Sequence, residues 1–350
     1  MKIGIMTVHD ASNFGAFLQA NSMRMFLEKK GHEVYFIQTN TPKYVRNMYY
    51  KLPVTRRSLS HPVEEFQKYL FGRKKWKIFF SARKDFKEIP ISEAEKMDRV
   101  IIGSDEMWNI KEPIFRNLAY FGCGMKDVTA YGISVGRAEY EDFVEQPEIM
   151  EQIKKIKRIL ARDRKTQEVI EQITGIKPDM VCDPTFLVPV EENTQKISNR
   201  YLEKNRFILV YTYPFVMSQT IQNHIVRFAR KNNLKIVSAG FFFGWCDYNL
   251  NCSPQQFSSV LNKAEYVVTT TFHGTIFSFL NHTKFLTIPF SQKVEDVLEK
   301  VGLSNNRVEE ECSYEQFEEK ILNFKGEYQE VDNRVSVLAK HSEELLVGIK

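Results

Sequence analysis

One histidine, His273, stands where acid–base chemistry is possible. It follows an apolar segment directly and enters a helix across Gly274. Histidine titrates near neutral pH, so an imidazole at a strand-to-helix turn can give or take a proton. A purely structural histidine is the alternative. Of the other histidines, only His9, at the end of the first predicted strand, has a place near a cleft. No H-E-x-x-H or similar ligand spacing occurs, so we expect no protein-held metal.

The polar turn 103–109 is a second candidate, and it follows another apolar segment. It offers Asp105, Trp108 and Asn109 within a few residues. Carboxylates and amides bond sugar hydroxyls, and an aromatic ring supports the C–H face of a sugar. The alternative is that Trp108 fills the core and Asp105 caps a helix. Both interpretations remain open at this point.

Two further segments are candidates for anion binding. Asn13 and Gly15 lie at the first strand-to-helix turn, where free backbone N–H groups and the helix dipole favour an anion, although a simple Asn13 cap explains the same residues. Arg162 is expected to close a helix that passes through Leu160. Its guanidinium suits a multiply charged anion, whereas an exposed surface position is the alternative. Asp183 is interpreted as part of a structural turn.

The order of apolar segments and helical patterns predicts an α/β protein with two doubly wound, Rossmann-like domains. Ligands bind such sheets at the carboxyl ends of their strands, so we expect the site in a cleft where the two sheets face each other. A helix is expected through Ile153, Ile156, Ile159 and Leu160. The domains are expected at 1–190, with a helical insertion near 42–90, and at 191–330, followed by a helix at 331–350 that packs on the first domain.

Composition narrows the class of protein. The 350 residues suit about two domains, and a net charge of +5 spread along the chain does not favour nucleic-acid binding. The 5 cysteines form no C-x-x-C pair and favour a reducing cytoplasm. We expect neither a signal peptide nor a membrane span. The basic, aromatic stretch from Arg56 to Phe80 leaves room for a peripheral contact at the inner membrane face.

Together, the motifs resemble an ordered series found in the polysaccharide pyruvyl transferase family. Each segment alone is weak evidence for the family, but all of them in this order are improbable by chance. The resemblance spans nearly the whole chain. Residues 293–303 are also similar to the closing helix of the family. The segments that carry the resemblance are 13–19, 103–109, 131–136, 161–163, 183–187 and 272–278.

The resemblance implies a fold like that of GT-B glycosyltransferases. It also implies transfer of a pyruvyl group from phosphoenolpyruvate to two hydroxyls of one sugar, which forms a cyclic ketal and releases phosphate. No cofactor is expected besides this donor substrate. The acceptor would be a sugar of a cell-surface polysaccharide, such as a capsule or exopolysaccharide, or a lipid-linked or nucleotide-linked precursor.

The resemblance assigns roles to residues as well. His273 would be the acid or base, and Arg162 would clamp phosphate or carboxylate. Thr271 departs from the family pattern, which often has Arg there; Lys284, Lys293 or Arg137 are candidates to supply the missing charge. The expected donor-binding residues are Asn13, Gly15, Gly274, Thr275 and Lys293, and the expected acceptor-binding residues are Asp105, Trp108, Asn109 and Ser134.

Two other functions fit the same fold. One is a GT-B-type glycosyltransferase, whose nucleotide-sugar diphosphate would also suit Arg162 and a helix N-terminus. The other is a noncatalytic member that binds glycan.

Overall fold

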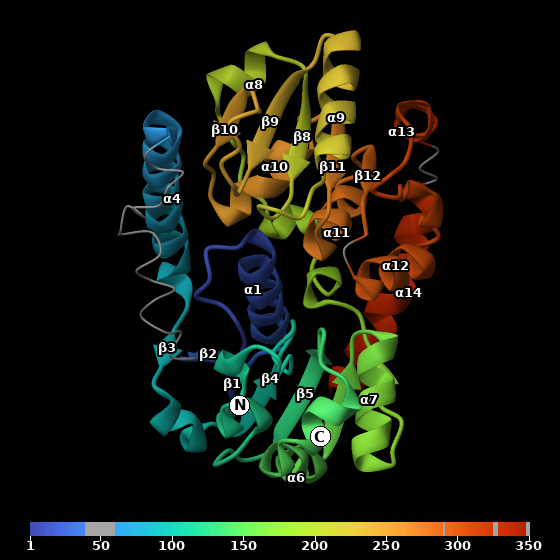
Figure 1. Ribbon diagram of the computed structural model, residues 1–350. Helices are drawn as coiled ribbons and strands as arrows, with labels where there is room; N and C mark the ends of the chain where they lie inside the picture. The colour runs from blue at the N-terminus through green and yellow to red at the C-terminus, as the bar shows by residue number, and fades with distance from the viewer. Residues whose placement is uncertain (39–59, 290, 325–327, 348–350) are drawn as a thin grey trace.

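The protein contains two β-sheets, each made of parallel strands. The sheets lie end to end, with helix α1 (Phe14–Lys29) between them (Figure 1). The computed structural model describes residues 1–38, 60–289, 291–324 and 328–347. Helices flank each sheet, as the alternation of strand and helix patterns predicts. The expected fold class, two Rossmann-like domains, is therefore confirmed.

The first sheet has the strand order β3-β2-β1-β4-β5-β6-β7, and every pair is parallel. The central strand β4 is buried along its length, as expected when helices cover both faces of a parallel sheet. The strands are β1 (Lys2–Met6), β2 (Glu33–Ile37), β3 (Glu88–Ile89), β4 (Arg99–Ile102), β5 (Val128–Ile133), β6 (Arg158–Ala161) and β7 (Asp179–Met180).

The helices of the first domain begin and end at the signals seen in the sequence. The Asn13 side chain accepts a hydrogen bond from Ala16 N and caps α1. Gly175, with φ of 73°, takes the left-handed conformation that ends α7. Besides α1, these helices are α4 (Pro62–Ala82), α5 (Tyr140–Val144), α6 (Pro147–Lys155) and α7 (Arg164–Thr174).

The helix predicted through Leu160 is wrong. Helix α6 ends at Lys155, and Arg158–Ala161 form strand β6 between β5 and β7. The spacing of Ile153, Ile156 and Ile159 fits a helix, but a short apolar segment is equally suited to a buried strand, and pairing with both neighbours decides it. Arg162 therefore follows a strand end, where sheets of this kind bind ligands.

The described part of the predicted insertion is largely helical. Residues 42–59 of that insertion lie outside the described residues, whereas α4 stands beside the second sheet rather than the first (Figure 1). Asn251 Nδ2 donates to Phe71 O over 3.2 Å, and Lys75 Nζ lies 4.3 Å from the ring centre of Phe241. Helix α4 is thus attached to the second domain by a backbone carbonyl and a lysine side chain.

The second sheet has the order β10-β9-β8-β11-β12, again with every pair parallel. The edge strand β10, like β3 in the first sheet, was not predicted. The strands are β8 (Phe207–Tyr211), β9 (Lys235–Ala239), β10 (Tyr248–Leu250), β11 (Tyr266–Thr269) and β12 (Phe285–Thr287). The helices are α8 (Arg200–Lys204), α9 (Gln219–Lys231), α10 (Phe257–Leu261), α11 (Phe272–Leu280), α12 (Gln292–Val301), α13 (Tyr314–Leu322) and α14 (Tyr328–Val347).

The two domains share an apolar interface. One hydrophobic cluster includes buried residues of both, and the ring of Phe14 on α1 stacks on that of Phe257 on α10 with centroids 4.4 Å apart. Arg164, at the start of α7, bonds the buried Asp296 of α12 through Nε at 2.9 Å. These contacts hold the ends of the two sheets opposite each other.

Helix α14 returns from the second domain to the first. Cys182 N donates to Ser342 Oγ over 2.9 Å, and Lys30 pairs with Glu343. In Figure 1, α14 lies on the side of the molecule opposite α4. The domain boundaries at 190 and 330 stay predictions; the first sheet ends at Met180 and the second begins at Phe207.

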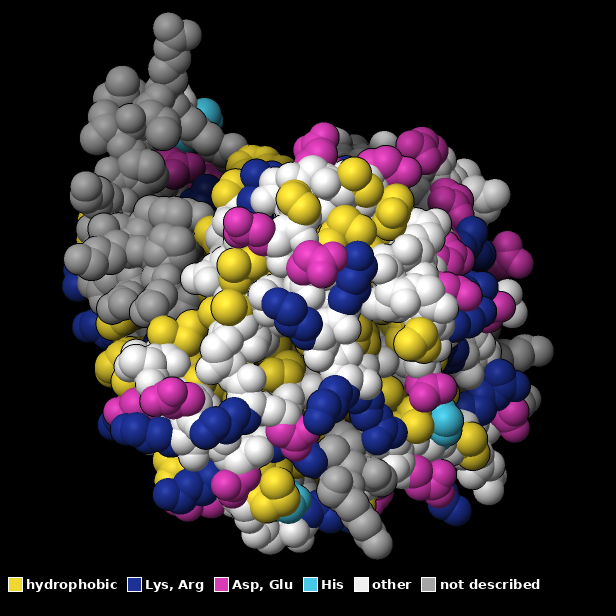
Figure 2. All heavy atoms as spheres, turned by 90° about the horizontal axis from the view of Figure 1, so that it is seen from below, with side chains coloured by type: hydrophobic (Ala, Val, Ile, Leu, Met, Phe, Trp, Pro, Cys, Tyr) yellow, Lys and Arg dark blue, Asp and Glu magenta, His cyan; other side chains and the backbone are white. Residues whose placement is uncertain are grey.

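Acidic and basic side chains are interspersed on the face of the first domain that points away from the second (Figure 2). Such mixing gives this face no extended field of one sign. Within the described residues, no helix is both long enough and apolar enough to cross a membrane.

Candidate active site

A cavity of about 610 Å³ lies where the strand order reverses in both sheets. The reversal falls between β1 and β4 in the first sheet and between β8 and β11 in the second. Ligands of doubly wound sheets bind at such points. The loops after these strands therefore meet at one place, as do the N-terminal ends of several helices. Residues lining the cavity include Val8, Asn13, Asp105, Glu106, Ser134, Arg137, Lys165, Tyr213, Thr270, Thr271, Phe272, His273 and Lys293.

His273 is in the first turn of α11 and forms part of the cavity wall. Its Nε2 lies 3.4 Å from Asp183 Oδ2, a contact between the second domain and the first. Nδ1 lies against Gly15, where an added Cβ would come within 2.1 Å of this atom. Only a residue without a side chain fits between α1 and the imidazole, and Nδ1 is the nitrogen that Asp183 does not hold.

Asp183 is a buried carboxylate that several groups share. Its Oδ1 accepts hydrogen bonds from Thr185 N at 3.1 Å and Thr185 Oγ1 at 2.9 Å. Its Oδ2 accepts from Arg162 Nη1 at 3.1 Å and faces His273. Burial favours the neutral acid, but the positive charges of His273 and Arg162 outweigh it and hold the pKa of Asp183 well below its usual range. The carboxylate is therefore ionised beside the imidazole.

Arg162 lies between carboxylates rather than in the cavity. Its Nη2 donates to Asp105 Oδ1 at 3.3 Å and its Nη1 to Asp183, while the guanidinium carbon is 4.7 Å from the ring centre of Phe272. Only 4% of the residue is exposed. A guanidinium keeps its charge when buried, and here two anions satisfy it. The predicted donor clamp is therefore already occupied by residues of the protein.

The turn after β4 depends on a glycine. Gly103 has φ of 108°, and a Cβ there would lie 2.3 Å from Tyr131 O, so the chain can turn only without a side chain. Ser104 Oγ then donates to Gly132 O at 2.9 Å. Asp105 also has a positive φ, of 88°, and its carboxylate reaches both Arg162 and the cavity. This turn joins the charged cluster to the space where substrate would lie.

Basic side chains line the cavity on several sides. Lys293 pairs with Glu106, and its Nζ lies 5.3 Å from the ring centre of Phe272. Arg137 Nη2 bonds Glu112 at 2.8 Å. Both residues were candidates for the charge missing at Thr271, and both line the cavity together with Lys165. Lys284, the third candidate, does not line it and instead faces the ring of Tyr266.

The N-terminal ends of four helices also border the cavity. Their cap residues are Asn13 for α1, Asp163 for α7, Thr271 for α11 and Ser291 for α12, and each lines the cavity. The first turns of α1, α7 and α11 contain no acidic residue. Helix N-termini carry partial positive charge, so together with the nearby cations they form an environment suited to a polyanion.

The sequence comparison agrees with this arrangement. The model of the family described as "Polysaccharide pyruvyl transferase" matches residues 13–291, which is most of the chain. The chain belongs to the polysaccharide pyruvyl transferase family. The resemblance drawn from the ordered motifs is confirmed. A comparison with curated proteins found no match.

Solved structures share the fold at low identity. The glycosyltransferase SnogD from Streptomyces nogalater has 13% identity and a TM-score of 0.51, with 99% of each chain covered. UDP-GlcNAc 2-epimerase from Methanocaldococcus jannaschii has 11% identity and a TM-score of 0.52, with 97% of this chain and 100% of that chain covered. This pyruvyl transferase family member is therefore similar in fold to GT-B glycosyltransferases and epimerases.

The structure brings several predicted site residues of this family member together. Asn13, Asp105, Ser134, His273 and Lys293 all line the cavity, and Gly15 lies directly beside the imidazole of His273. They come from segments that are far apart in the sequence. Their roles with substrate stay predictions.

Other predicted site residues lie elsewhere. Trp108 is fully buried, and its Nε1 donates to Tyr120 O, so its ring has no free face for a sugar. Asn109 is also buried and does not line the cavity. Gly274 N donates to Thr271 Oγ1 and Thr275 N to Thr271 O, so both amides belong to the helix cap and cannot serve the donor. The sequence interpretations of these residues therefore need correction.

Asp183 is the main participant that local sequence reasoning missed. Its Asp-Pro-Thr setting fits a structural turn, and Asp183 does cap that turn. The additional contacts with Arg162 and His273 depend on pairings distant in sequence. The one available signal was the place of residues 183–187 in the ordered family motifs.

Proposed function

We propose that this protein transfers a pyruvyl group from phosphoenolpyruvate to two hydroxyls of a sugar in a cell-surface polysaccharide or its precursor. The products are a cyclic ketal and phosphate. The observation that carries the proposal is the Asp183–His273 pair at the wall of a cavity surrounded by helix N-termini and basic side chains. Membership of the pyruvyl transferase family supports the same reaction class.

In this mechanism His273 is the general acid. Asp183 contacts Nε2 and stabilises the imidazolium, which gives its proton to the methylene carbon of phosphoenolpyruvate. Carbon C2 then carries positive charge and is attacked by the first sugar hydroxyl, whose proton passes to the imidazole. Loss of phosphate restores the positive charge on C2. The second hydroxyl attacks there, and its proton leaves with the phosphate.

The donor is held by charge in this proposal. Phosphoenolpyruvate carries a phosphate and a carboxylate, and Lys293, Arg137 and Lys165 supply the opposing side-chain charges. Lys293 is the best placed of them, because it stands at the beginning of α12, and only 16% of its side chain is exposed. Arg162 does not bind the donor in this proposal. It holds Asp105 and Asp183 in position through hydrogen bonds.

Asp105 is the proposed acceptor-binding carboxylate. Burial works to raise its pKa, but Arg162, Lys293 and His273 outweigh burial, so the pKa of Asp105 is lowered. An ionised carboxylate can accept hydrogen bonds from sugar hydroxyls. Ser134, also on the cavity wall, offers a second polar group.

Peripheral contact with an acidic membrane face remains part of the proposal. Helix α4 exposes Phe66 and Leu70, and the exposed basic residues Arg73 and Lys77 follow along the helix. Basic side chains beside exposed apolar ones can contact anionic lipid headgroups. Sedimentation with vesicles that contain or lack anionic lipid tests this contact.

The reaction itself is tested with purified protein, phosphoenolpyruvate and a panel of sugars that are free, nucleotide-linked or lipid-linked. Phosphate release and a product heavier by one pyruvate less water are expected. A parallel incubation with nucleotide sugars tests the glycosyltransferase alternative. Transfer of a sugar, with no ketal formed from phosphoenolpyruvate, would overturn the proposal.

A further inference from the structure

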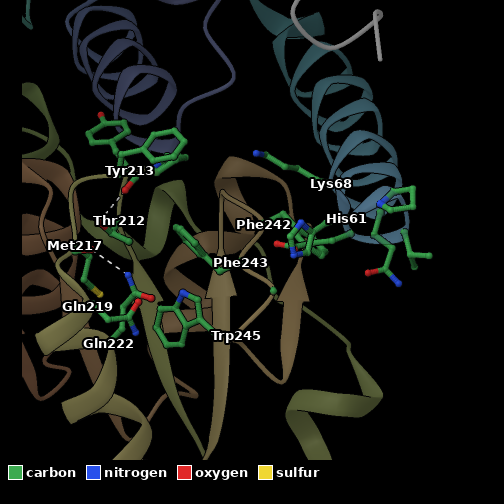
Figure 3. A pocket seen from close by; sticks show the side chains of 17 residues that line it. His61, Lys68, Thr212, Tyr213, Met217, Gln219, Gln222, Phe242, Phe243 and Trp245 are labelled. Atoms are coloured by element: carbon green, nitrogen blue, oxygen red, sulfur yellow. Dashed lines mark hydrogen bonds between the residues drawn. The ribbon is translucent and has the colours of Figure 1, made fainter. Parts of the chain in front are cut away.

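A groove of about 990 Å³ runs between α4 and the second domain and is larger than the cavity that contains His273. One wall is the N-terminal part of α4. The other consists of the loops after β8 and β9 and the beginning of α9. In Figure 3, Phe243 and Trp245 lie in the middle, between Gln219 and Gln222 on one side and His61 and Lys68 on the other.

Aromatic rings are the main apolar feature of this groove. The rings of Phe243 and Trp245 are 6.0 Å apart and tilted by 45°, and both are only partly buried. Phe215 is 91% exposed and has φ of 68°, an unfavourable conformation for a large side chain. Tyr213 is 37% exposed. Rings left this open to water are suited to cover the apolar faces of a ligand.

Side-chain amides supply the polar groups. Gln222 Nε2 donates to Met217 O at 3.0 Å, and Gln219 Nε2 donates to Asn223 Oδ1 at 3.1 Å. These bonds fix both amides and leave each Oε1 as an acceptor. A fixed acceptor beside an exposed ring matches a sugar, which has hydroxyls at its edge and C–H groups on its face.

The groove adjoins the cavity that contains His273. Tyr213 lines both spaces, and its hydroxyl accepts a hydrogen bond from Asn13 Nδ2 at 3.0 Å. Thr212, which lines the groove, is hydrogen bonded to Thr270, which lines the cavity, over 2.6 Å. A ligand whose reacting end lies beside His273 can therefore extend past Tyr213 into the groove.

We propose that this groove binds the saccharide chain of the acceptor beyond the sugar that receives the pyruvyl group. The inference rests on the proposed function, because it takes the reacting sugar to lie in the cavity beside His273. It adds a substrate class: the enzyme prefers an oligosaccharide over a monosaccharide. Rings and amides give the groove affinity for uncharged sugar units, whereas the charged cavity holds the donor.

The test uses gluco- and galacto-oligosaccharides with the matching monosaccharides, titrated calorimetrically in the presence of phosphoenolpyruvate. Trp245→Ala should weaken oligosaccharide binding about tenfold, the loss expected for one aromatic contact, and leave monosaccharide binding unchanged. Phe215→Ala should act in the same direction without affecting folding, because that side chain is almost fully exposed. Phe66→Ala, an exposed ring on α4 outside the groove, is the matched control.

Equal oligosaccharide affinity in wild type, Trp245→Ala and Phe215→Ala overturns the inference, as does binding of no oligosaccharide in the panel. Ketal formation, measured separately, distinguishes this failure from failure of the proposed function. If ketals form at the same rate on long acceptors in all variants, the groove assignment fails while the function stands. If oligosaccharides bind through the groove but no ketal forms, the function fails.

Discussion

The two cavities that meet at Tyr213 differ in what lines them. The smaller contains His273, Lys293 and the carboxylates Asp105 and Glu106. The larger is lined mostly by rings, amides and other uncharged side chains, with Glu64 and Lys68 on its α4 wall. Charges in the smaller cavity are held in place by partners a few ångströms away, as in the Lys293–Glu106 pair.

On the proposed function, this difference places the reaction in the smaller of the two cavities. Proton transfer needs a few groups at fixed distances, and ionised partners such as Asp183 fix them. Recognition of a long, uncharged ligand depends instead on a large contact surface. Changes in the charged cavity should therefore affect rate, and changes in the groove should affect affinity for extended acceptors.

The largest effect is expected from His273→Gln. Loss of the proton donor should lower phosphate release from phosphoenolpyruvate by about 1,000-fold, within the range of general acid catalysis. Far-ultraviolet circular dichroism and thermal melting should stay close to wild type. A rate within a few-fold of wild type would remove the histidine from its proposed role.

Asp183→Asn should have the next largest effect. Without the carboxylate the imidazolium loses its stabilising partner, and kcat should fall about 100-fold. The KM for phosphoenolpyruvate should change much less, because Asp183 does not line the cavity. Asp179→Asn, a change at an exposed carboxylate in β7, is the control. A fall in kcat that follows a loss of folded protein, measured by circular dichroism, would indicate a structural role alone.

Lys293→Met should act on the donor. The KM for phosphoenolpyruvate should rise about tenfold with kcat changed much less, because one opposing charge is lost. Initial rates at several salt concentrations measure both this change and the weaker salt dependence expected of the variant. Lys263→Met, at an exposed lysine away from the cavity, should leave KM unchanged. An unaltered KM in Lys293→Met would exclude the lysine from donor binding.

The smallest effect on activity is expected from Lys75→Met on α4, which should instead change how stability depends on pH. Burial lowers the pKa of Lys75 to about 7, whereas an unfolded lysine binds its proton up to about pH 10. Between these values the unfolded chain holds more protons, so the free energy of unfolding should rise with pH. Lys75→Met should flatten this rise in urea titrations at pH 7 and 9. The same slope in both proteins would show that Lys75 is charged when folded.

Much of the fold follows from local patterns. Strands β4, β8 and β11 consist of apolar segments that favour a strand on their own, and Gly175 and Gly302 end α7 and α12 in the left-handed conformation. The edge strands β3 and β10 carry too few residues for a period to show. Residues 158–161 alone fit either a helix or a strand. Their pairing with β5 and β7 makes them a strand.

The candidate site was less predictable from the sequence than the fold was. His273 and Asn13 were found because each stands at a strand-to-helix turn that faces the cavity. The part of Arg162 was misjudged because its partners, Asp105 and Asp183, are distant in sequence, and no local pattern shows that they occupy its guanidinium. Trp108 was misjudged for a related reason: a ring in a polar turn can point inward to the core.

The bond between Cys182 and Ser342 gives the last helix a bearing on the site. Cys182 immediately precedes Asp183, so Ser342 anchors the backbone one residue before the carboxylate that faces His273. A substitution at Ser342 would therefore reach the Asp183–His273 pair from outside the cavity, through the main chain and without touching any group that lines it.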